Sequence, residues 1–177
     1  MRFDVEECPQ IPWKNRGGTT RELAICEEKQ QLVWRLSLAD IGADGPFSAF
    51  PGLARVHTII SGQGLRLSGG GETLHADLLR PLVFDGELSA MAHLNDGPCR
   101  ALNIIYEPKR VTASVRIQTA GRFISSEDET IIFVVSGTLT SGDGSIFLPG
   151  QGGVLPLGNH LSLSEGGQVI VMDLTRF

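Results

Sequence analysis

The sequence predicts an all-β fold, because short apolar or alternating segments recur between turn residues and no long helical pattern interrupts them. Glycine is frequent, with 22 residues in a chain of 177. Gly, Asp, Asn and Pro separate the segments, as expected for turns between strands. The predicted strands are residues 33–41, 54–61, 64–68, 100–106, 130–136, 144–148 and 168–174. Closure into a sandwich or barrel would protect the strand edges.

The segment VWRLSLADI, residues 33–41, shows the clearest alternation. One face of this strand carries Trp34, Leu36, Leu38 and Asp40. Successive side chains of a strand point to opposite faces. Because the first face is the more apolar, we expect Arg35 and Ser37 to point the other way.

An internal repeat relates residues 57–106 to residues 130–174. Both segments run from an apolar strand through a Ser-Gly turn, further short strands and a glycine-rich turn to a final apolar strand. Tandem strand rolls of this kind are typical of a bicupin, two double-stranded β-helix (jelly-roll) barrels. We therefore expect residues 1–110 to form an N-terminal segment plus a first cupin-like barrel. Residues 111–177 would form the second, and the two would pack as one compact unit.

Composition excludes several classes of function. The net charge of −5 argues against a nucleic-acid binder, which normally carries a basic face. No segment approaches the roughly 20 apolar residues of a membrane-spanning helix, and the acidic N-terminus is unlike a signal peptide. Cys8, Cys26 and Cys99 are widely spaced, which favours reduced thiols. We expect a cytoplasmic protein with neither nucleic-acid nor membrane partners.

The histidine pattern argues against a metal centre. A metal-binding cupin uses a His-x-His pair, a Glu and a later His, but His57, His75, His93 and His160 contain no such pair. His57 alternates with Arg55 on one predicted strand, and a lone His there is more often a core or surface residue than a ligand. Nucleophile-elbow and phosphate-loop motifs are also absent. We expect no metal and no cofactor.

The stretch PWKNRGGTTREL, residues 12–23, gathers side chains suited to a small-molecule pocket. Trp13 is either a packing anchor or a pocket wall. Asn15 is suited to capping a turn through its side chain. Thr20 and Glu22 share one face of a strand, and a Glu22–Arg35 ion pair is one reading of that face.

A second candidate group lies in GPFSAFPGLAR, residues 45–55. Phe47, Phe50 and Pro51 resemble a rigid corner with apolar plugs, and Arg55 follows directly. A guanidinium beside aromatic rings is a good carboxylate grip, although an Arg on a strand also suits a solvated face.

Two later segments add further candidates. Phe84 would be an apolar wall, and Asp85 with the following glycine is first of all a turn. Asn103 interrupts the apolar strand LNIIY, so its amide belongs either to a buried network or to a ligand contact.

These motifs together resemble the HutD/Ves family. The resemblance rests on PWKNRGGTTREL, WRLSLADI, GPFSAFPGLAR, VFDGEL and NDGPCRALN in this order, and it covers most of the chain. It implies a bicupin fold with a regulatory or protective role in bacterial histidine utilisation, sensing an intermediate such as formylglutamate or urocanate. It also implies ligand contacts for Asn15 and Arg55, and for Asp85 either contact with a ligand amine or orientation of Arg55. Arg16 replaces a family glycine, and Ala101, Tyr106 and Glu107 stand where the family has other residues.

Three hypotheses follow for the function. The first is a metal-free bicupin that binds a small carboxylate through Arg35 and Arg55. Directional hydrogen bonds would come from Asn15 and Asn103, and apolar walls from Trp13, Phe47, Phe50 and Phe84. The second is an isomerase or hydrolase on the same fold, with Glu22, His57 and Asp85 as acid–base candidates. The third is an interaction module whose second barrel supports a homodimer.

Overall fold

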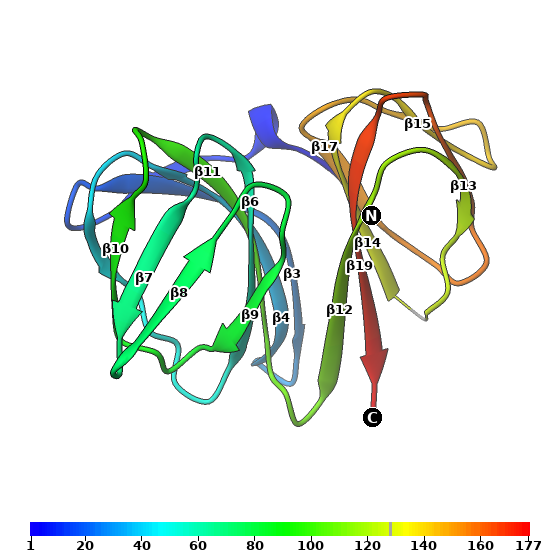
Figure 1. Ribbon diagram of the computed structural model, residues 1–177. Coiled ribbons are helices and arrows are strands. Elements are labelled where there is room, and N and C mark those ends of the chain that lie inside the picture. Colours follow the sequence, from blue (N-terminus) through cyan, green and yellow to red (C-terminus); the bar gives the residue numbers. More distant parts are fainter. Residues whose placement is uncertain (128) are drawn as a thin grey trace. The chain divides into compact units, whose positions relative to one another are not determined.

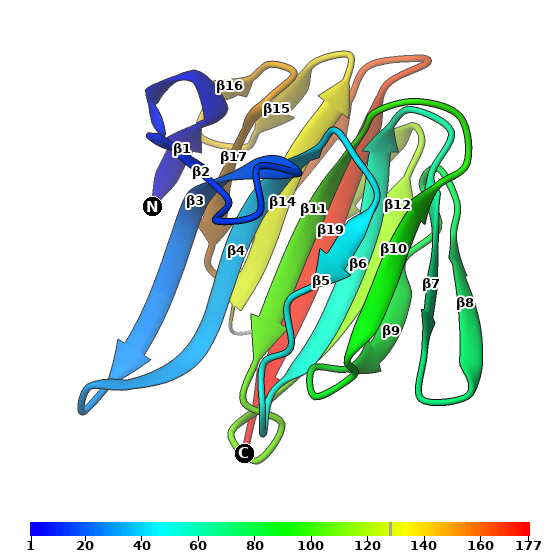
Figure 2. The same cartoon turned by 90° about the vertical axis from the view of Figure 1, so that its left-hand side faces the viewer.

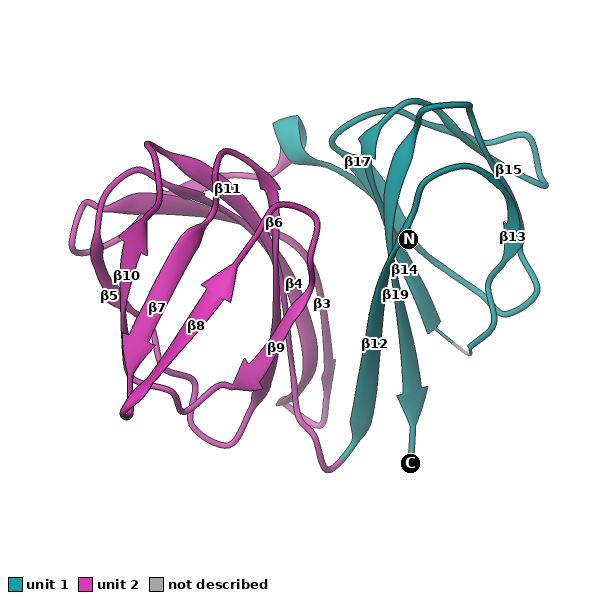
Figure 3. Ribbon diagram, viewed as in Figure 1, with its two compact units in different colours: residues 1–7, 110–177 teal, residues 8–109 magenta. Residues whose placement is uncertain are grey.

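The computed structural model describes residues 1–127 and 129–177, and nearly all of its regular structure is antiparallel β-sheet (Figure 1). The one helical element in this part of the chain is the 3₁₀ turn η1 (Val5–Glu7). The chain divides into two compact units, residues 8–109 and residues 1–7 with 110–177 (Figure 3). The first seven residues belong to the second unit because β1 (Arg2–Asp4) pairs with β17 (Gln151–Leu155).

The unit of residues 8–109 contains two sheets. The six-stranded sheet has the order β2 (Gln10–Pro12), β3 (Gly18–Glu28), β4 (Gln31–Ile41), β11 (Cys99–Tyr106), β6 (Ala54–Ser61), β9 (Leu82–Asp85). The four-stranded sheet has the order β5 (Gly45–Phe47), β10 (Ala90–Leu94), β7 (Leu65–Gly69), β8 (Glu72–Ala76). Figure 2 shows β3 and β4 as a long hairpin. Apolar side chains of both sheets, such as Ile59 and Ala101 against Leu67 and Ala92, share one core.

The unit of residues 1–7 and 110–177 repeats this strand order. Its five-stranded sheet runs β1, β17, β14 (Glu129–Ser136), β19 (Gln168–Arg176), β12 (Val111–Gln118). Its four-stranded sheet runs β13 (Gly121–Ile124), β18 (His160–Leu163), β15 (Leu139–Ser141), β16 (Ile146–Phe147). The series β4, β11, β6, β9 thus corresponds to β12, β19, β14, β17. The repeat therefore extends further towards the N-terminus of each unit than the sequence pattern indicated.

The two central strand pairs also share a register defect. The pairing of β6 with β11 shifts between Ser61 and Ile59, and that of β14 with β19 shifts between Ser136 and Val134. Each shift leaves one residue unpaired, as in a β-bulge. This common feature aligns the two units residue by residue.

The predicted all-β class is confirmed, and the predicted strands all appear within a few residues of their expected ends. In β4 the alternation holds, with Trp34, Leu36 and Leu38 on one face and Arg35 and Ser37 on the other. Both faces are covered, since even Ser37 is buried. The polar face of β4 points into the interior of its own barrel, because Ala39 on that face belongs to the core.

Candidate functional site

A cavity of about 510 Å³ opens between the sheets of the unit 8–109. We call it the arginine cavity. Eight of the sequence-predicted site residues line it: Trp13, Asn15, Thr20, Arg35, Phe47, Phe50, Arg55 and Asn103. Among the described residues its lining includes three cationic side chains, two of them Arg35 and Arg55, and no carboxylate.

Strand register places the two arginines in one row. Ile105 of β11 lies opposite Arg35 of β4 on one side and opposite Arg55 of β6 on the other. Asn103, two residues before Ile105, lies in the same way between Ser37 and His57. Side chains two residues apart share a face of a strand, so both rows face the barrel interior.

Arg55 is a buried cation held by neutral groups. Its side chain is 6% exposed, and its Nε and Nη2 donate to Asn103 Oδ1 at 3.0 and 2.7 Å. Its Cζ lies 4.2 Å from the ring centre of Phe47, 5.5 Å from that of Phe84 and 5.6 Å from that of Phe50. Burial, with a smaller contribution from the charge of Arg35, lowers the pKa of Arg55 to about 9. The protein thus keeps a positive charge where water no longer compensates it.

Arg35 has its donors free. Its Nε is buried without a hydrogen-bond partner, and none of its other nitrogens is bonded within residues 1–127 and 129–177. Its Cζ lies 5.4 Å from the ring centre of Phe50, so both guanidinium groups gather around that one ring. A buried donor without a partner is costly, which makes Arg35 the most unsatisfied group of the cavity.

Asn103 connects Arg55 to His57 behind the cavity wall. Its Oδ1 accepts both bonds from Arg55, and His57 Nδ1 lies 2.7 Å away. Because this oxygen only accepts, His57 carries its proton on Nδ1. His57 is fully buried, and burial followed by the charge of Arg55 lowers its pKa to about 3. His57 is therefore neutral at physiological pH.

This buried imidazole predicts that stability falls with acidity. Between about pH 6.5 and pH 3 the unfolded chain binds a proton at His57 that the folded chain does not. The free energy of unfolding should therefore fall by up to about 1.4 kcal/mol per pH unit across this window, and be unaffected by His57 above it. Urea unfolding at several pH values, compared with a His57→Gln variant, measures this slope. An equal slope in both proteins would contradict the assignment.

The turn of residues 13–18 covers one part of the cavity. Trp13 Nε1 donates to Thr20 Oγ1 at 2.6 Å, and Asn15 Oδ1 accepts the backbone N–H of Gly17 at 3.0 Å. Asn15 thus caps the turn and also lines the cavity, so its two interpretations are compatible. Arg16 has φ of 59°, in the left-handed region that favours glycine.

Replacing Arg16 with glycine should raise the free energy of unfolding by about 1 kcal/mol, because a Cβ in the left-handed conformation costs about this much. Chemical denaturation measures the change. Arg16→Ala is the matched control, since it removes the side chain but keeps the strained Cβ. Equal gains in both variants would show that the backbone conformation is not the cause.

Four predicted site residues lie outside the cavity lining. Glu22 and Asp85 are exposed, and Asp85 Oδ1 accepts the backbone N–H of Glu87 in a turn. Phe84 packs behind the wall against Phe47, with ring centres 6.4 Å apart, and His57 is buried behind Asn103. The three acid–base candidates of the enzyme hypothesis are therefore not gathered at the cavity.

The suggested Glu22–Arg35 ion pair is wrong, because the register does not bring the two together. Glu22 lies opposite Ser37, whereas Arg35 lies opposite Ile25. A register shift between Glu22 and Ala24 separates the two pairs. Sequence alternation alone gives no sign of this bulge.

Sequence reasoning missed six lining residues: Lys14, Ser37, Ala39, Pro46, Ser48 and Ile105. Three of them had a usable signal. Ser37 and Ala39 share the face of Arg35, and Ile105 shares the face of Asn103, so period-two alternation would have added all three. Lys14 had none, because it lies in a turn where no periodicity applies.

The residues around the cavity do not fit a divalent metal. Of the His, Cys, Asp and Glu types that hold such ions, the described lining includes none. The neighbouring His57 uses Nδ1 towards Asn103, and two guanidinium groups would repel a cation.

The other unit supplies an internal comparison. In the aligned registers Thr130 stands in the place of Arg55, Asp173 in the place of Ile105 and Arg116 in the place of Ser37. Asp173 accepts from Thr130 Oγ1 at 2.7 Å and is ion-paired with Arg116. Asp173, Thr130 and Arg116 of this unit thus satisfy and neutralise each other. Arg35 and Arg55 of the first unit, by contrast, have no carboxylate partner among the described residues.

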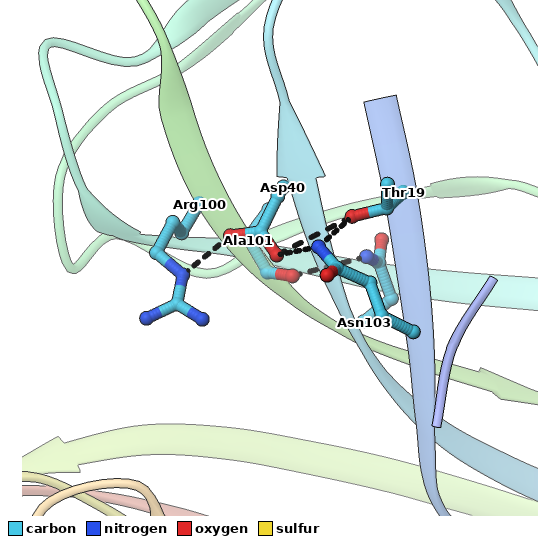
Figure 4. Close-up of polar contacts among 6 residues, drawn as sticks. Thr19, Asp40, Arg100, Ala101 and Asn103 are labelled. Carbon is cyan, nitrogen blue, oxygen red and sulfur yellow. Dashed lines mark hydrogen bonds and ion pairs between the residues drawn. The ribbon is translucent and has the colours of Figure 1, made fainter. Parts of the chain in front are cut away.

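A polar cluster on the other face of β4 and β11 ties the strands that carry the site. Arg100 Nε donates to Asp40 Oδ1 at 2.6 Å, and Thr19 Oγ1 lies 3.4 Å from Asp40 Oδ2 (Figure 4).

The amide nitrogen of Asn103 is weakly bonded. Asn103 Nδ2 makes only a long 3.4 Å contact with Ala101 O. Asn103 is therefore oriented mainly through its oxygen.

Comparison with known proteins places this chain in a family. A family model described as HutD matches residues 5–169. The chain therefore belongs to the HutD family. A protein Ves from Cronobacter sakazakii is 30% identical over 177 residues, covering 98% of this chain and 97% of the relative. A 21.2 kDa protein from the hutC 3′ region of Pseudomonas putida is 35% identical over 141 residues, 75% of this chain and 72% of its own.

Solved structures agree with this assignment. HutD from Pseudomonas fluorescens SBW25 matches with a TM-score of 0.85 and 29% identity, covering 100% of this chain and 98% of that one. A cupin 2 conserved barrel domain protein from Leptotrichia buccalis matches with a TM-score of 0.58 and 11% identity, which shows the fold alone. The resemblance to HutD/Ves and the cupin-type fold are thus confirmed.

None of the helices described for this HutD protein is long and apolar enough to span a membrane.

Proposed function

We propose that this HutD protein binds a small carboxylate metabolite in the arginine cavity, as a regulatory or accessory component of histidine utilisation. Formylglutamate and urocanate are the candidate ligands. The observation that carries the proposal is Arg35, a guanidinium at a cavity wall with no hydrogen bond to any described residue. Guanidinium groups bind carboxylates through two parallel hydrogen bonds.

The electrostatics of the cavity support an anionic ligand. Arg35 and Arg55 repel each other enough to contribute to the lowered pKa of Arg55. An anion between them would compensate both charges in a partly desolvated site, where such contacts are strong. In the other unit, Arg116 is instead neutralised by an internal carboxylate, Asp173.

The link to histidine utilisation rests on the relatives. The family carries the name HutD, and one relative from Pseudomonas putida is described by its position in the hutC 3′ region. Neither observation names a ligand, so the carboxylate class comes from the cavity and the metabolic setting comes from the relatives.

Thermal unfolding against a panel of acids tests the proposal. The panel contains formylglutamate, urocanate, formate, glutamate and histidine. A ligand at about a hundred times its Kd adds roughly 2.7 kcal/mol of stability, which is a readily measured rise in Tm. The rise should vanish in Arg55→Met and persist in the matched variant Arg66→Met, because Arg66 is exposed on the outer face of its sheet. No rise with any acid would reject the proposal.

A further inference from the structure

A second hollow, of about 580 Å³, lies outside the arginine cavity, and the described linings of the two share no residue. Its lining includes Arg16, from the turn of residues 13–18, and Arg100, from β11. Asp40 is the one carboxylate among the lining residues that the structure describes. We call this hollow the Arg16–Arg100 groove.

Strand register places the polar lining of the groove in one row. Thr19 of β3 lies opposite Asp40 of β4, and Asp40 lies opposite Arg100 of β11. Side chains that lie directly opposite each other in neighbouring strands share one face of the sheet. The row is therefore fixed by the sheet itself rather than by a loop.

Asp40 orients Arg100 through a single nitrogen. Arg100 Nε donates to Asp40 Oδ1 at 2.6 Å, while Asp40 Oδ2 has longer contacts, of 3.4 Å, with Thr19 Oγ1 and Gln10 Nε2. Both terminal nitrogens of Arg100 turn away from Asp40 (Figure 4). They bond no other residue in the described ranges, so their N–H donors remain available to a ligand.

Arg16 is held at the groove in a strained conformation. Its φ of 59° brings Cβ close to the following carbonyl oxygen, which costs stability. Backbone bonds fix the turn, since Gly17 O accepts the N–H of Gly42 at 2.8 Å and that of Ala43 at 3.1 Å. The Arg16 guanidinium has no hydrogen bond or ion pair within residues 1–127 and 129–177. Strained backbone conformations cluster at ligand-binding positions, which points to a ligand here.

We propose that the Arg16–Arg100 groove binds a phosphate group, either inorganic phosphate or a small phosphate monoester. The phosphate accepts hydrogen bonds from the terminal nitrogens of Arg100 and from the guanidinium of Arg16. Asp40 compensates only one of these two cations. A phosphate has three strong acceptor oxygens and more negative charge than a carboxylate, which suits two guanidinium groups with free donors. The site is separate from the arginine cavity and independent of its ligand.

Isothermal titration at low ionic strength tests the groove with inorganic phosphate, glycerol 3-phosphate and acetate. Low salt limits the screening of partly exposed charges. The wild type should bind a phosphate probe, and Arg16→Gln and Arg100→Gln should each raise its Kd about fivefold, the upper range for a partly exposed ion pair. Arg66→Gln, at an exposed arginine of the four-stranded sheet, should keep the wild-type Kd.

Arg16→Gly separates a binding residue from one that is only strained. Glycine relieves the left-handed backbone, so the free protein should have a higher Tm. The phosphate Kd should nevertheless rise about as much as in Arg16→Gln. A higher Tm with an unchanged phosphate Kd would overturn the proposal, because Arg16 would then carry strain without a ligand.

The probes also identify the source of the phosphate. Tighter binding of glycerol 3-phosphate than of inorganic phosphate would assign the groove to a monoester, and any other order would assign it to free phosphate. Failure of the folded wild type to bind either probe would overturn the proposal. So would an equal loss of acetate binding in Arg16→Gln, which would mark a site for any anion. If Arg35→Met weakened phosphate binding and Arg16→Gln did not, phosphate would occupy the arginine cavity and the groove would be rejected.

Discussion

Replacing Arg35 with methionine should abolish binding of small acids without making the folded protein less stable. Arg35 supplies free donors to the cavity and has no hydrogen bond to the residues that the structure describes. Removal of one partner of a desolvated charged contact costs about 2 kcal/mol or more of binding free energy, which is at least about thirtyfold in Kd. The stability should stay equal or rise, since the repulsion of Arg55 disappears and methionine keeps an apolar stem of similar length.

Titration calorimetry with the tightest acid of the panel measures the first effect, and urea unfolding measures the second. Arg66→Met is the matched control for loss of a positive charge, and it should change neither quantity. If Arg35→Met kept its affinity but lost more than about 1 kcal/mol of stability, Arg35 would be a structural residue. The case for an anion site would then rest on Arg55 alone.

Much of this arrangement could be predicted from the sequence, because it follows from strand periodicity. The alternation in residues 33–41 placed Arg35 and Ser37 together, and residues 54–61 became β6 with the expected bounds. Asn103 stood out as an amide in an apolar strand, and it does belong to a buried network. The alternation of residue types is a reliable guide here, because successive side chains of a strand point to opposite faces and a register slip would move each one to the wrong face.

The remaining features depend on pairing between distant strands. Glu22 was expected near Arg35, but the bulge after it changes the register against β4. His57 lies behind Asn103 because β6 pairs with β11 in this register. The pairing of distant strands cannot be read from a single sequence. Lys14 enters the lining only through the shape of a turn, so no periodic signal marks it.

The correspondence of the two units was also hidden at the level of residue types. Arg55 and Ile105 of one unit correspond to Thr130 and Asp173 of the other, and no similarity connects them. The shared bulge, the strand order and the Ser-Gly turn after each strand make the comparison possible. Each unit nevertheless carries one charged side chain at these two positions, the cation Arg55 in one unit and the anion Asp173 in the other.

This correspondence predicts that Ile105→Asp will block the cavity with an internal carboxylate. The new side chain would stand between Arg35 and Arg55, in the place that Asp173 has in the other unit. It would compensate the guanidinium groups and compete with any acidic ligand. We expect binding of small acids to weaken by at least about thirtyfold, the equivalent of 2 kcal/mol or more for a close charged contact.

Ile105→Asn is the matched control, because it has the same size and polarity without the charge. Both variants lose the buried isoleucine, so the difference between them isolates the carboxylate. The aspartate variant should exceed the asparagine variant by about 1.5–3 kcal/mol in the free energy of unfolding, as expected for hydrogen bonds to a charged group. The asparagine variant should still bind acids. If both variants bound acids equally well, the positive charge of this row would not be what holds the ligand, since a carboxylate within reach of both arginines must otherwise compete.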